Sequence, residues 1–142
     1  MRLVLDTNIL LSLFVFHDPR HIALRNGWQR GHYQLLLRQD CFEEFIEVIA
    51  RRQFKQSAEQ VRLSADALRG ECTWVDQAKV EHPISLPKCR DKDDQKFLEL
   101  AAGGQAEALL TYDKLLLKCR KRVRFQIVTP EIFFEQTQHI KS

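Results

Sequence analysis

Two aspartates follow short apolar runs of the kind that form buried strands. Asp6 comes directly after Leu3-Val4-Leu5, and Asp113 comes three residues after the run from Ala108 to Leu110. In an open α/β sheet the carboxyl ends of the strands meet at one edge, where ligands bind. Either aspartate alone also suits a helix N-cap or a turn. Together they predict a pair of carboxylates at the same edge of a sheet.

A third acid borders the buried face of a predicted helix. Unrolling the stretch from Cys41 to Arg52 at about 100° per residue places its apolar side chains on one face. Glu43 and Glu47 fall on the far side, whereas Glu44 lies beside the apolar face. We therefore expect Glu44 either to reach a site or to extend back to water.

The fourth acid opens another predicted helix, from Asp94 to Ala102. The same unrolling puts Asp94 at the centre of the buried side, and the side chains predicted to point away are Gln95, Lys96 and Glu99. A carboxylate aimed inward needs a donor, a cation or a metal ion to offset its desolvation. Asp91, just upstream, suits a helix cap or an outer position in such a site.

Four carboxylates gathered in one place repel one another. At an effective dielectric constant of about 20 each close pair is unfavourable by on the order of a few kcal/mol, and a bound cation removes that repulsion. Oxygen ligands without histidine or thiolate favour a hard ion, Mg²⁺ or Mn²⁺. Such ions lower the pKa of bound water and stabilise in-line attack on a phosphodiester. The predicted chemistry of Asp6, Glu44, Asp94 and Asp113 is therefore hydrolysis of a nucleic-acid backbone.

The elements that would position these acids alternate along the chain. Five runs have strand character, the last of them weakly: Leu3 to Leu5, Tyr33 to Leu37, Ala108 to Leu110, Phe125 to Val128, and Thr73 to Val75. Helical patterns separate them: Ile9 to Phe16, Ile22 to Arg30, Cys41 to Arg52, Ala58 to Arg69, Asp94 to Ala102, and Glu131 to Gln138. This alternation predicts an α/β fold with a mainly parallel central sheet of four or five strands, covered by helices on both sides. We expect a single domain spanning residues 1–142.

Two helix starts have capping signals. Asp40 is followed by Glu43 at the spacing of an N-terminal capping box, and Ser57 is followed by Gln60 at the same spacing. The stretch from Pro83 to Pro87 predicts a loop.

The composition is that of an ordinary globular protein. Hydrophobic residues make up 44% and charged residues 29%, and the formal charge of +3 permits nucleic-acid binding without arguing for it alone. The four cysteines are widely spaced and lack a zinc-finger pattern, which indicates reduced, packed thiols. The apolar stretch from Ile9 to Phe16 is shorter than the roughly 20 residues of a membrane span. We therefore expect no membrane segment and a soluble, cytoplasmic protein.

The acids lie in segments that resemble the four motifs of the PIN-domain family. The opening LVLDTNIL, residues 3–10, is similar to the first strand and acidic motif, and Glu43-Glu44-Phe45 to the second. The segment DKDDQKFLELA, residues 91–101, resembles the third motif, and LTYDK, residues 110–114, the fourth. Their order and spacing match over nearly the whole chain. The sequence looks most like the bacterial branch of toxin components related to VapC-type toxins.

The resemblance implies a three-layer α/β/α sandwich and an endoribonuclease that uses Mg²⁺ or Mn²⁺ to cut single-stranded RNA. Carried over by motif, the metal-binding acids are Asp6, Glu44, Asp94 and Asp113, and the residues that organise the site through hydrogen bonds are Asn8 and Thr111. The resemblance also implies a cognate antitoxin protein that blocks the site, and a homodimer. Many relatives carry a further acid two residues after the last of these aspartates, where this chain has Leu115. An acid expected at a second metal site is therefore missing.

Basic residues flank two of the acidic segments. Lys114 and Lys118 begin a cluster just after the fourth motif, and Arg51 stands near the end of the middle helix. Such cations can line a path for phosphates. A solvated helix surface explains them equally well.

Two other functions stay open. In the first, the fold is a catalytically silent module that binds RNA or a protein partner, and the retention of all four acids argues against it. In the second, Asp6 is the nucleophile of a phosphatase or phosphotransfer domain. Such phosphatases need a second aspartate two residues later as acid and base, and this chain has Asn8 there.

Overall fold

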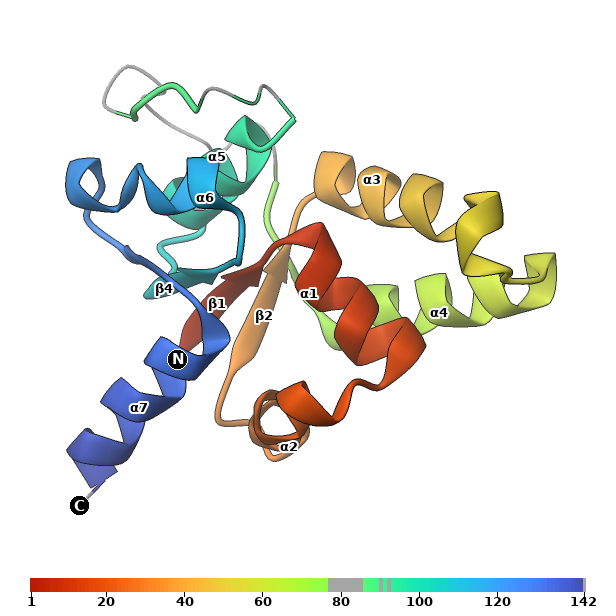
Figure 1. Ribbon diagram of the computed structural model, residues 1–142, viewed down its shortest axis with the longest axis horizontal. Helices are drawn as coiled ribbons and strands as arrows, with labels where there is room; N and C mark the ends of the chain where they lie inside the picture. The colour runs from red at the N-terminus through yellow and green to blue at the C-terminus, as the bar shows by residue number, and fades with distance from the viewer. Residues whose placement is uncertain (77–85, 90, 92, 142) are drawn as a thin grey trace.

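The computed structural model describes residues 1–76, 86–89, 91 and 93–141 (Figure 1). These residues form a five-stranded sheet in which all neighbouring strands are parallel, in the order β3-β2-β1-β4-β5. The strands are β1 (Arg2–Leu5), β2 (Gln34–Leu37), β3 (Thr73–Trp74), β4 (Ala108–Leu110) and β5 (Gln126–Val128). All five predicted strands are present, including the weakest one.

Helices connect the strands and cover the sheet on both sides, which confirms the predicted α/β class (Figure 1). The α-helices are α1 (Thr7–Leu11), α2 (Ile22–Gln29), α3 (Gln39–Ile49), α4 (Ala58–Glu71), α5 (Gln95–Gly103), α6 (Lys114–Leu117) and α7 (Pro130–Lys141). Short 3₁₀ turns lie at Pro19–His21, Arg52–Phe54 and Arg120–Arg122, and a π-helical turn, Ser12–Phe16, continues α1. No helix of the described residues has the length and apolar character needed to cross a membrane.

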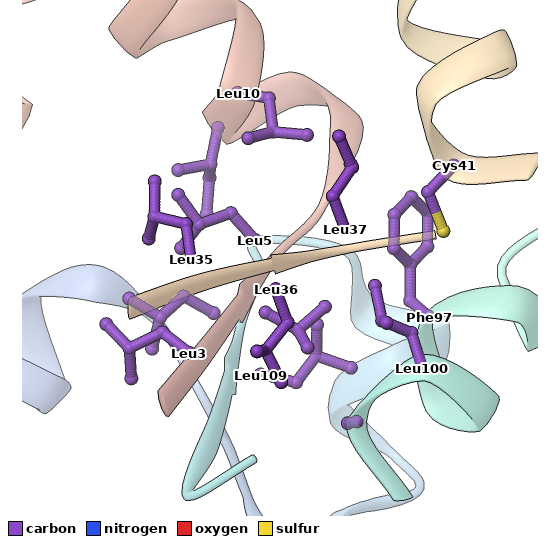
Figure 2. Close-up of a cluster of buried hydrophobic side chains, with 14 of the residues drawn as sticks. Leu3, Leu5, Leu10, Leu35, Leu36, Leu37, Cys41, Phe97, Leu100 and Leu109 are labelled. Atoms are coloured by element: carbon purple, nitrogen blue, oxygen red, sulfur yellow. The ribbon is translucent and has the colours of Figure 1, made fainter. Parts of the chain in front are cut away.

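The central strands are buried on both faces of the sheet. Figure 2 shows Leu35 and Leu37 of β2 on the side of the sheet that carries Leu10 of α1. Leu36 points to the opposite side, toward α5 and its Leu100. Successive side chains of a strand alternate between the two faces. Burial of both faces therefore explains why these strands are unbroken apolar runs rather than alternating ones.

The start of α3 differs from its sequence prediction. Its N-cap is Arg38, and Asp40 lies in the first helical turn, where it pairs with the Arg38 guanidinium. The prediction that Asp40 precedes the helix as a capping residue is therefore wrong. The second predicted capping pair is confirmed, because the side chains of Ser57 and Gln60 each accept a hydrogen bond from the other residue's backbone N–H.

Helix α6 was not predicted, because four residues are too few to show a helical period. The predicted loop from Pro83 to Pro87 lies mostly outside the described residues, and its last two residues are neither helix nor strand.

Gly27 of α2 marks a close approach of that helix to Tyr33. A Cβ atom added at Gly27 would lie 2.1 Å from Cε2 of Tyr33, whose ring packs edge-on against Phe133 of α7. We predict that Gly27→Ala lowers the free energy of unfolding by about 1–3 kcal/mol, because the ring and the helix must move apart.

Urea denaturation of the variant and the parent protein measures this difference. Gly70→Ala, at a position on α4 with open space around it, is the matched control, and it is expected to be neutral or to gain up to about 1 kcal/mol. Equal stability of Gly27→Ala and the parent would contradict the close approach.

Candidate functional site

The order of the strands reverses its direction beside β1. The chain runs from β1 to β2 and β3 on one side and then crosses to β4 and β5 on the other, so the winding reverses between β1 and β4. In open parallel sheets ligands bind at such a reversal, beyond the carboxyl ends of the strands. Asp6 follows β1, and Asp113 follows β4. The Asp6 N–H donates to the Leu110 carbonyl over 3.2 Å, which joins the two strand ends.

Asp6 is buried and held from two sides. As the N-cap of α1 it accepts a hydrogen bond from the Ile9 N–H (3.0 Å), which is why the helix begins two residues earlier than predicted. Its other oxygen accepts a hydrogen bond from the Thr111 hydroxyl. Burial raises the pKa of Asp6; the two hydrogen bonds oppose this increase, and the charges of Asp113 and Glu44 add to it. Two other predicted acids, Asp113 and Glu44, are therefore close enough for their charges to act on the Asp6 carboxylate.

Asp113 is the N-cap of α6. Its carboxylate accepts a hydrogen bond from the Leu115 N–H (2.8 Å), and its own N–H donates to the Thr111 hydroxyl oxygen (2.9 Å). Thr111 is fully buried. Because its hydroxyl donates to Asp6 and accepts from the Asp113 backbone, Thr111 joins the two strand-end acids.

Asp94 stands at the N-cap position of α5, but its side chain does not cap the helix. Among the buried side-chain oxygens of the described residues, Oδ2 of Asp94 is the one without a hydrogen-bond partner. Burial raises the pKa of Asp94 to about 7, helped by contact with the Asp113 carboxyl group and by the charges of Asp91 and Asp6. A carboxylate that leaves its own helix uncapped and lies among other acids has the surroundings of a cation ligand.

Glu44 reaches the same edge from α3, and a lysine reaches it from α5. The Thr7 hydroxyl donates to Oε2 of Glu44, and Nζ of Lys96 lies 2.8 Å from its Oε1. The lysine side chain is only 16% exposed, so the prediction that Lys96 points away is wrong. Burial alone would lower the pKa of Lys96, but the hydrogen bond to Glu44 and the charge of Glu44, with smaller contributions from Cys41 and Asp93, raise the pKa of the ammonium group.

Gln95 and Glu99 were also predicted to point away, but both contact residues that lie outside α5. Gln95 accepts a hydrogen bond from the Cys89 N–H (2.6 Å) and donates to the Pro87 carbonyl (3.1 Å). Glu99 lies 2.9 Å from Nη2 of Arg38. Unrolling a helix assigns each side chain either to one buried face or to solvent. Helix α5, however, has neighbours on more than one side.

Arg38 follows β2 and forms an ion-pair network that was not predicted. Its side chain is 3% exposed, and Nη2 lies 2.6 Å from Asp40 and 2.9 Å from Glu99. A buried guanidinium needs such partners to offset its desolvation. The network ties the start of α3, which carries Glu44, to α5, which Asp94 precedes.

The double variant Asp40→Asn/Glu99→Gln is predicted to lose about 3–5 kcal/mol of stability, because it leaves a buried guanidinium without a counter-charge. Arg38→Met is expected to lose less, because the two acids that it leaves behind are each 29% exposed and can be hydrated. Urea denaturation ranks the variants. A greater loss in Arg38→Met than in the double variant would contradict this description of the network.

The other predicted residues surround the four acids. Asp91 is exposed and shapes the turn into α5, since its side chain accepts from the Asp93 N–H (2.9 Å) and its carbonyl from the Asp94 N–H (3.1 Å). Asn8 is exposed on α1. The residues predicted to contact nucleic acid are all exposed: Arg51, Lys114 and Lys118.

Comparison with known proteins decides the family. The family model described as PIN domain matches residues 2–115, a range that contains all four acids. The chain belongs to the PIN domain family. The resemblance inferred from the four motifs is therefore confirmed.

The fold of this PIN domain is similar to that of a chain in the crystal structure of VapBC2 from Rickettsia felis bound to a DNA fragment from their promoter. The TM-score is 0.62 at 18% sequence identity, and the match covers 90% of this chain and 97% of that chain. At this identity the likeness shows the fold, including the predicted three-layer arrangement. No curated protein sequence matches this chain.

The sheet edge where Asp6, Glu44, Asp94 and Asp113 lie is called the acidic edge below. Side chains of the PIN domain hydrogen-bond to one another there. Within residues 1–76, 86–89, 91 and 93–141, no three His, Cys, Asp or Glu side chains are already arranged to hold a metal ion. Both oxygens of Asp6 and both of Glu44 have protein donors, which a cation would in part replace. The unpartnered oxygen of Asp94 and the like charges around it fit a cation.

A thiol lies nearer to the acids than the sequence indicated. Burial is the main cause that raises the pKa of Cys89, and the charges of Asp94 and Asp113 are among the smaller contributions to this increase. A hard ion such as Mg²⁺ or Mn²⁺ nevertheless prefers oxygen ligands to a thiol. The prediction of oxygen ligands for the PIN site is unchanged.

A second network of polar side chains in the PIN domain, also not predicted, includes Tyr112, which lies between Thr111 and Asp113. The Tyr112 hydroxyl donates to Glu131 of α7 (2.5 Å) and lies 3.0 Å from Nε2 of His21. The opposite ring nitrogen of His21, which is buried, lies 2.5 Å from the Ser12 hydroxyl. This network connects the end of β4 to α7 and to the π-helical turn after α1.

Proposed function

We propose that this PIN domain is a metal-dependent nuclease that hydrolyses phosphodiester bonds of single-stranded RNA at the edge formed by Asp6, Glu44, Asp94 and Asp113. The observation that carries the proposal is the buried, unpartnered oxygen of Asp94, where burial and the neighbouring carboxyl groups together raise the pKa to about 7. Membership of a family whose members are typically nucleases supports the reaction class.

The four acids would hold Mg²⁺ or Mn²⁺, with Asp91 in an outer position and with Asn8 and Thr111 as supporting residues. When bound, such an ion lowers the pKa of water and offsets charge on the phosphate. Thr111 keeps Asp6 and Asp113 together, and Thr7 holds Glu44 beside them. The protein therefore supplies fixed carboxylates at a sheet edge where a phosphodiester can approach.

The experiment that tests the reaction class is incubation of the purified protein with single-stranded RNA of mixed sequence, with Mg²⁺, with Mn²⁺ and with chelator. Double-stranded RNA and single-stranded DNA serve as comparison substrates. Cleavage of single-stranded RNA that requires either metal supports the proposal. Equal cleavage of DNA would contradict the RNA specificity, and no cleavage of any substrate by folded protein would contradict the nuclease.

Two exposed lysines, the first residue of α6 and the residue that follows this helix, are proposed to contact the phosphates of RNA. Lys114 directly follows Asp113, and Lys118 lies one helical turn further on. On single strands each phosphate contact contributes roughly 0.7 to the slope of log affinity against log salt concentration. The double variant Lys114→Gln/Lys118→Gln is therefore predicted to reduce that slope by about 1.4 and to weaken binding for all sequences alike.

Fluorescence anisotropy of a labelled RNA in chelator, over a range of KCl concentrations, measures the slope. The control is Arg62→Gln on α4, an exposed arginine that pairs with Glu59 and Asp66. An unchanged slope in the lysine variant would contradict the contact, and a slope equally reduced in the control would show a non-specific charge effect.

We further propose that the chain is the toxin of a toxin-antitoxin pair in the cytoplasm, with a cognate antitoxin protein as partner and a homodimer as its assembly. The support is that the similar fold comes from a VapBC2 complex with promoter DNA. Induced expression in bacteria tests this function: growth arrest by the parent chain and normal growth with Asp6→Asn are expected. Normal growth with both chains would contradict the toxin role without touching the nuclease activity.

A further inference from the structure

Lys96 is a cation built into the acidic edge. Within the described residues, its ion pair with Glu44 is the one formed between a basic side chain and any of the four acids. Both partners are mostly buried, with side chains 16% and 22% exposed. Lysines at the surface, such as Lys114 and Lys118, lose no hydration in this way. A desolvated ammonium group interacts more strongly with nearby charge than a hydrated one.

The position two residues after Asp113 supplies no further acid. Position 115, two residues after Asp113, is a leucine whose side chain packs against the core and whose N–H is capped by Asp113. An apolar side chain cannot bind a hard cation. Position 115 therefore supplies no ligand for a second divalent ion, and among the described residues the basic side chain that pairs with one of the four acids is Lys96.

We propose that Lys96 is a catalytic residue whose ammonium group binds a non-bridging oxygen of the scissile phosphate and takes the place of a second metal ion. The inference rests on the proposed nuclease function. In the hydrolysis, the water oxygen bonds to phosphorus, the bond from phosphorus to one ribose oxygen breaks, and a proton from water ends on that ribose oxygen. Lys96 keeps its protons throughout and contributes charge.

The contacts of Glu44 allow the lysine to change partners. Oε2 of Glu44 is held by the Thr7 hydroxyl, and Oε1 is the atom beside Lys96. Glu44 therefore keeps its position when the ammonium group turns to a phosphate, and the flexible stem of a lysine permits that movement.

Three substitutions separate charge from structure. Lys96→Met removes the charge and the hydrogen bond, Lys96→Gln keeps a donor for Glu44 without the charge, and Lys96→Arg keeps the charge. The control is Arg62→Met, which removes an exposed positive charge on α4. Single-turnover cleavage at saturating RNA gives the rate, calorimetric titration with Mn²⁺ gives the number of ions bound, and thermal denaturation checks that each variant folds.

We expect Lys96→Met and Lys96→Gln to lower the cleavage rate about 10²–10³-fold, the effect of removing one fixed charge donor from a transition state. Lys96→Arg should retain more activity than either, and the control should match the parent. The parent, Lys96→Met and Lys96→Gln should each bind one Mn²⁺ ion per chain, which is a result independent of activity. If Lys96→Met does not fold, the cleavage rate of Lys96→Gln is compared with that of the parent instead.

Several results would overturn the inference. Full cleavage activity in a folded Lys96→Gln variant would show that the ion pair is only structural, while the proposed nuclease would stand. Two Mn²⁺ ions bound to the parent chain would remove the need for the lysine, and loss of Mn²⁺ binding in Lys96→Gln would make it a positioning residue for Glu44. Absence of cleavage by the parent protein would contradict the proposed function itself and this inference with it.

Discussion

Asp6→Asn is expected to lower the rate of RNA cleavage by about 10³-fold or more, which corresponds to the several kcal/mol of transition-state stabilisation that a metal ion supplies. The amide has the shape of the carboxylate and can still accept the hydrogen bond from Ile9, so the fold should persist. The same loss is expected for Glu44→Gln. Thr7, which directly follows Asp6 and begins α1, donates a hydrogen bond that holds Glu44 beside Asp6. Initial rates with saturating Mn²⁺ measure both effects.

The neighbour of Glu44 on α3 provides a matched control. Glu43 is exposed, and it accepts a hydrogen bond from the Gln39 amide rather than from a residue of the site. Glu43→Gln removes the same charge from the same helix and should leave the rate unchanged. If Glu43→Gln and Glu44→Gln were equally slow, the charge of the helix rather than the position of Glu44 would be responsible, and the proposed site would be wrong.

The second large effect is a loss of stability of the metal-free protein as the pH rises from 5 toward 8. The pKa of Asp94 is about 7 in the folded protein and 3.8 in its ordinary state. Between these values the folded chain binds a proton that the unfolded chain has released, so proton binding favours the folded state at low pH. That contribution decreases as the pH rises through 7. Asp6, whose pKa is also raised, acts in the same direction.

Urea denaturation in chelator at pH 5 and pH 8 measures the effect. His21 acts in the opposite direction over part of this range, because burial lowers its pKa, so the informative comparison is with Asp94→Asn. That variant should have a flatter pH dependence and should be more stable than the parent at pH 8. Asp93→Asn, which changes the exposed neighbour, should keep the slope of the parent. An identical slope in the parent and in Asp94→Asn would contradict the raised pKa.

The strands and the positions of the strand-end acids could be predicted because each depends on local sequence. Burial on both faces leaves an apolar run such as Leu35 to Leu37 with no polar interruption. The carboxyl ends of parallel strands share one edge, so the position of Asp6 follows from the run that precedes it. Helix α6 escaped prediction because it is set by one capping contact of Asp113 rather than by a repeating pattern.

The contacts around the acids could not be predicted because they join distant parts of the chain. Lys96 and Glu44 are 52 residues apart, and Arg38 and Glu99 are 61 apart. Unrolling a single helix assigns such side chains to solvent, since the partner belongs to another element. The spacing gives no signal for Lys96 either, because side chains two residues apart on a helix, such as those of Asp94 and Lys96, do not face each other.

The claim that the four acids form one cation site is tested most directly by calorimetric titration of Mn²⁺ into the parent protein, Asp94→Asn and Asp93→Asn. We expect saturable binding to the parent and to Asp93→Asn, and little or none to Asp94→Asn, whose amide removes the charge at the unpartnered oxygen. Absence of binding to the parent protein, or equal binding to Asp94→Asn, would contradict the account.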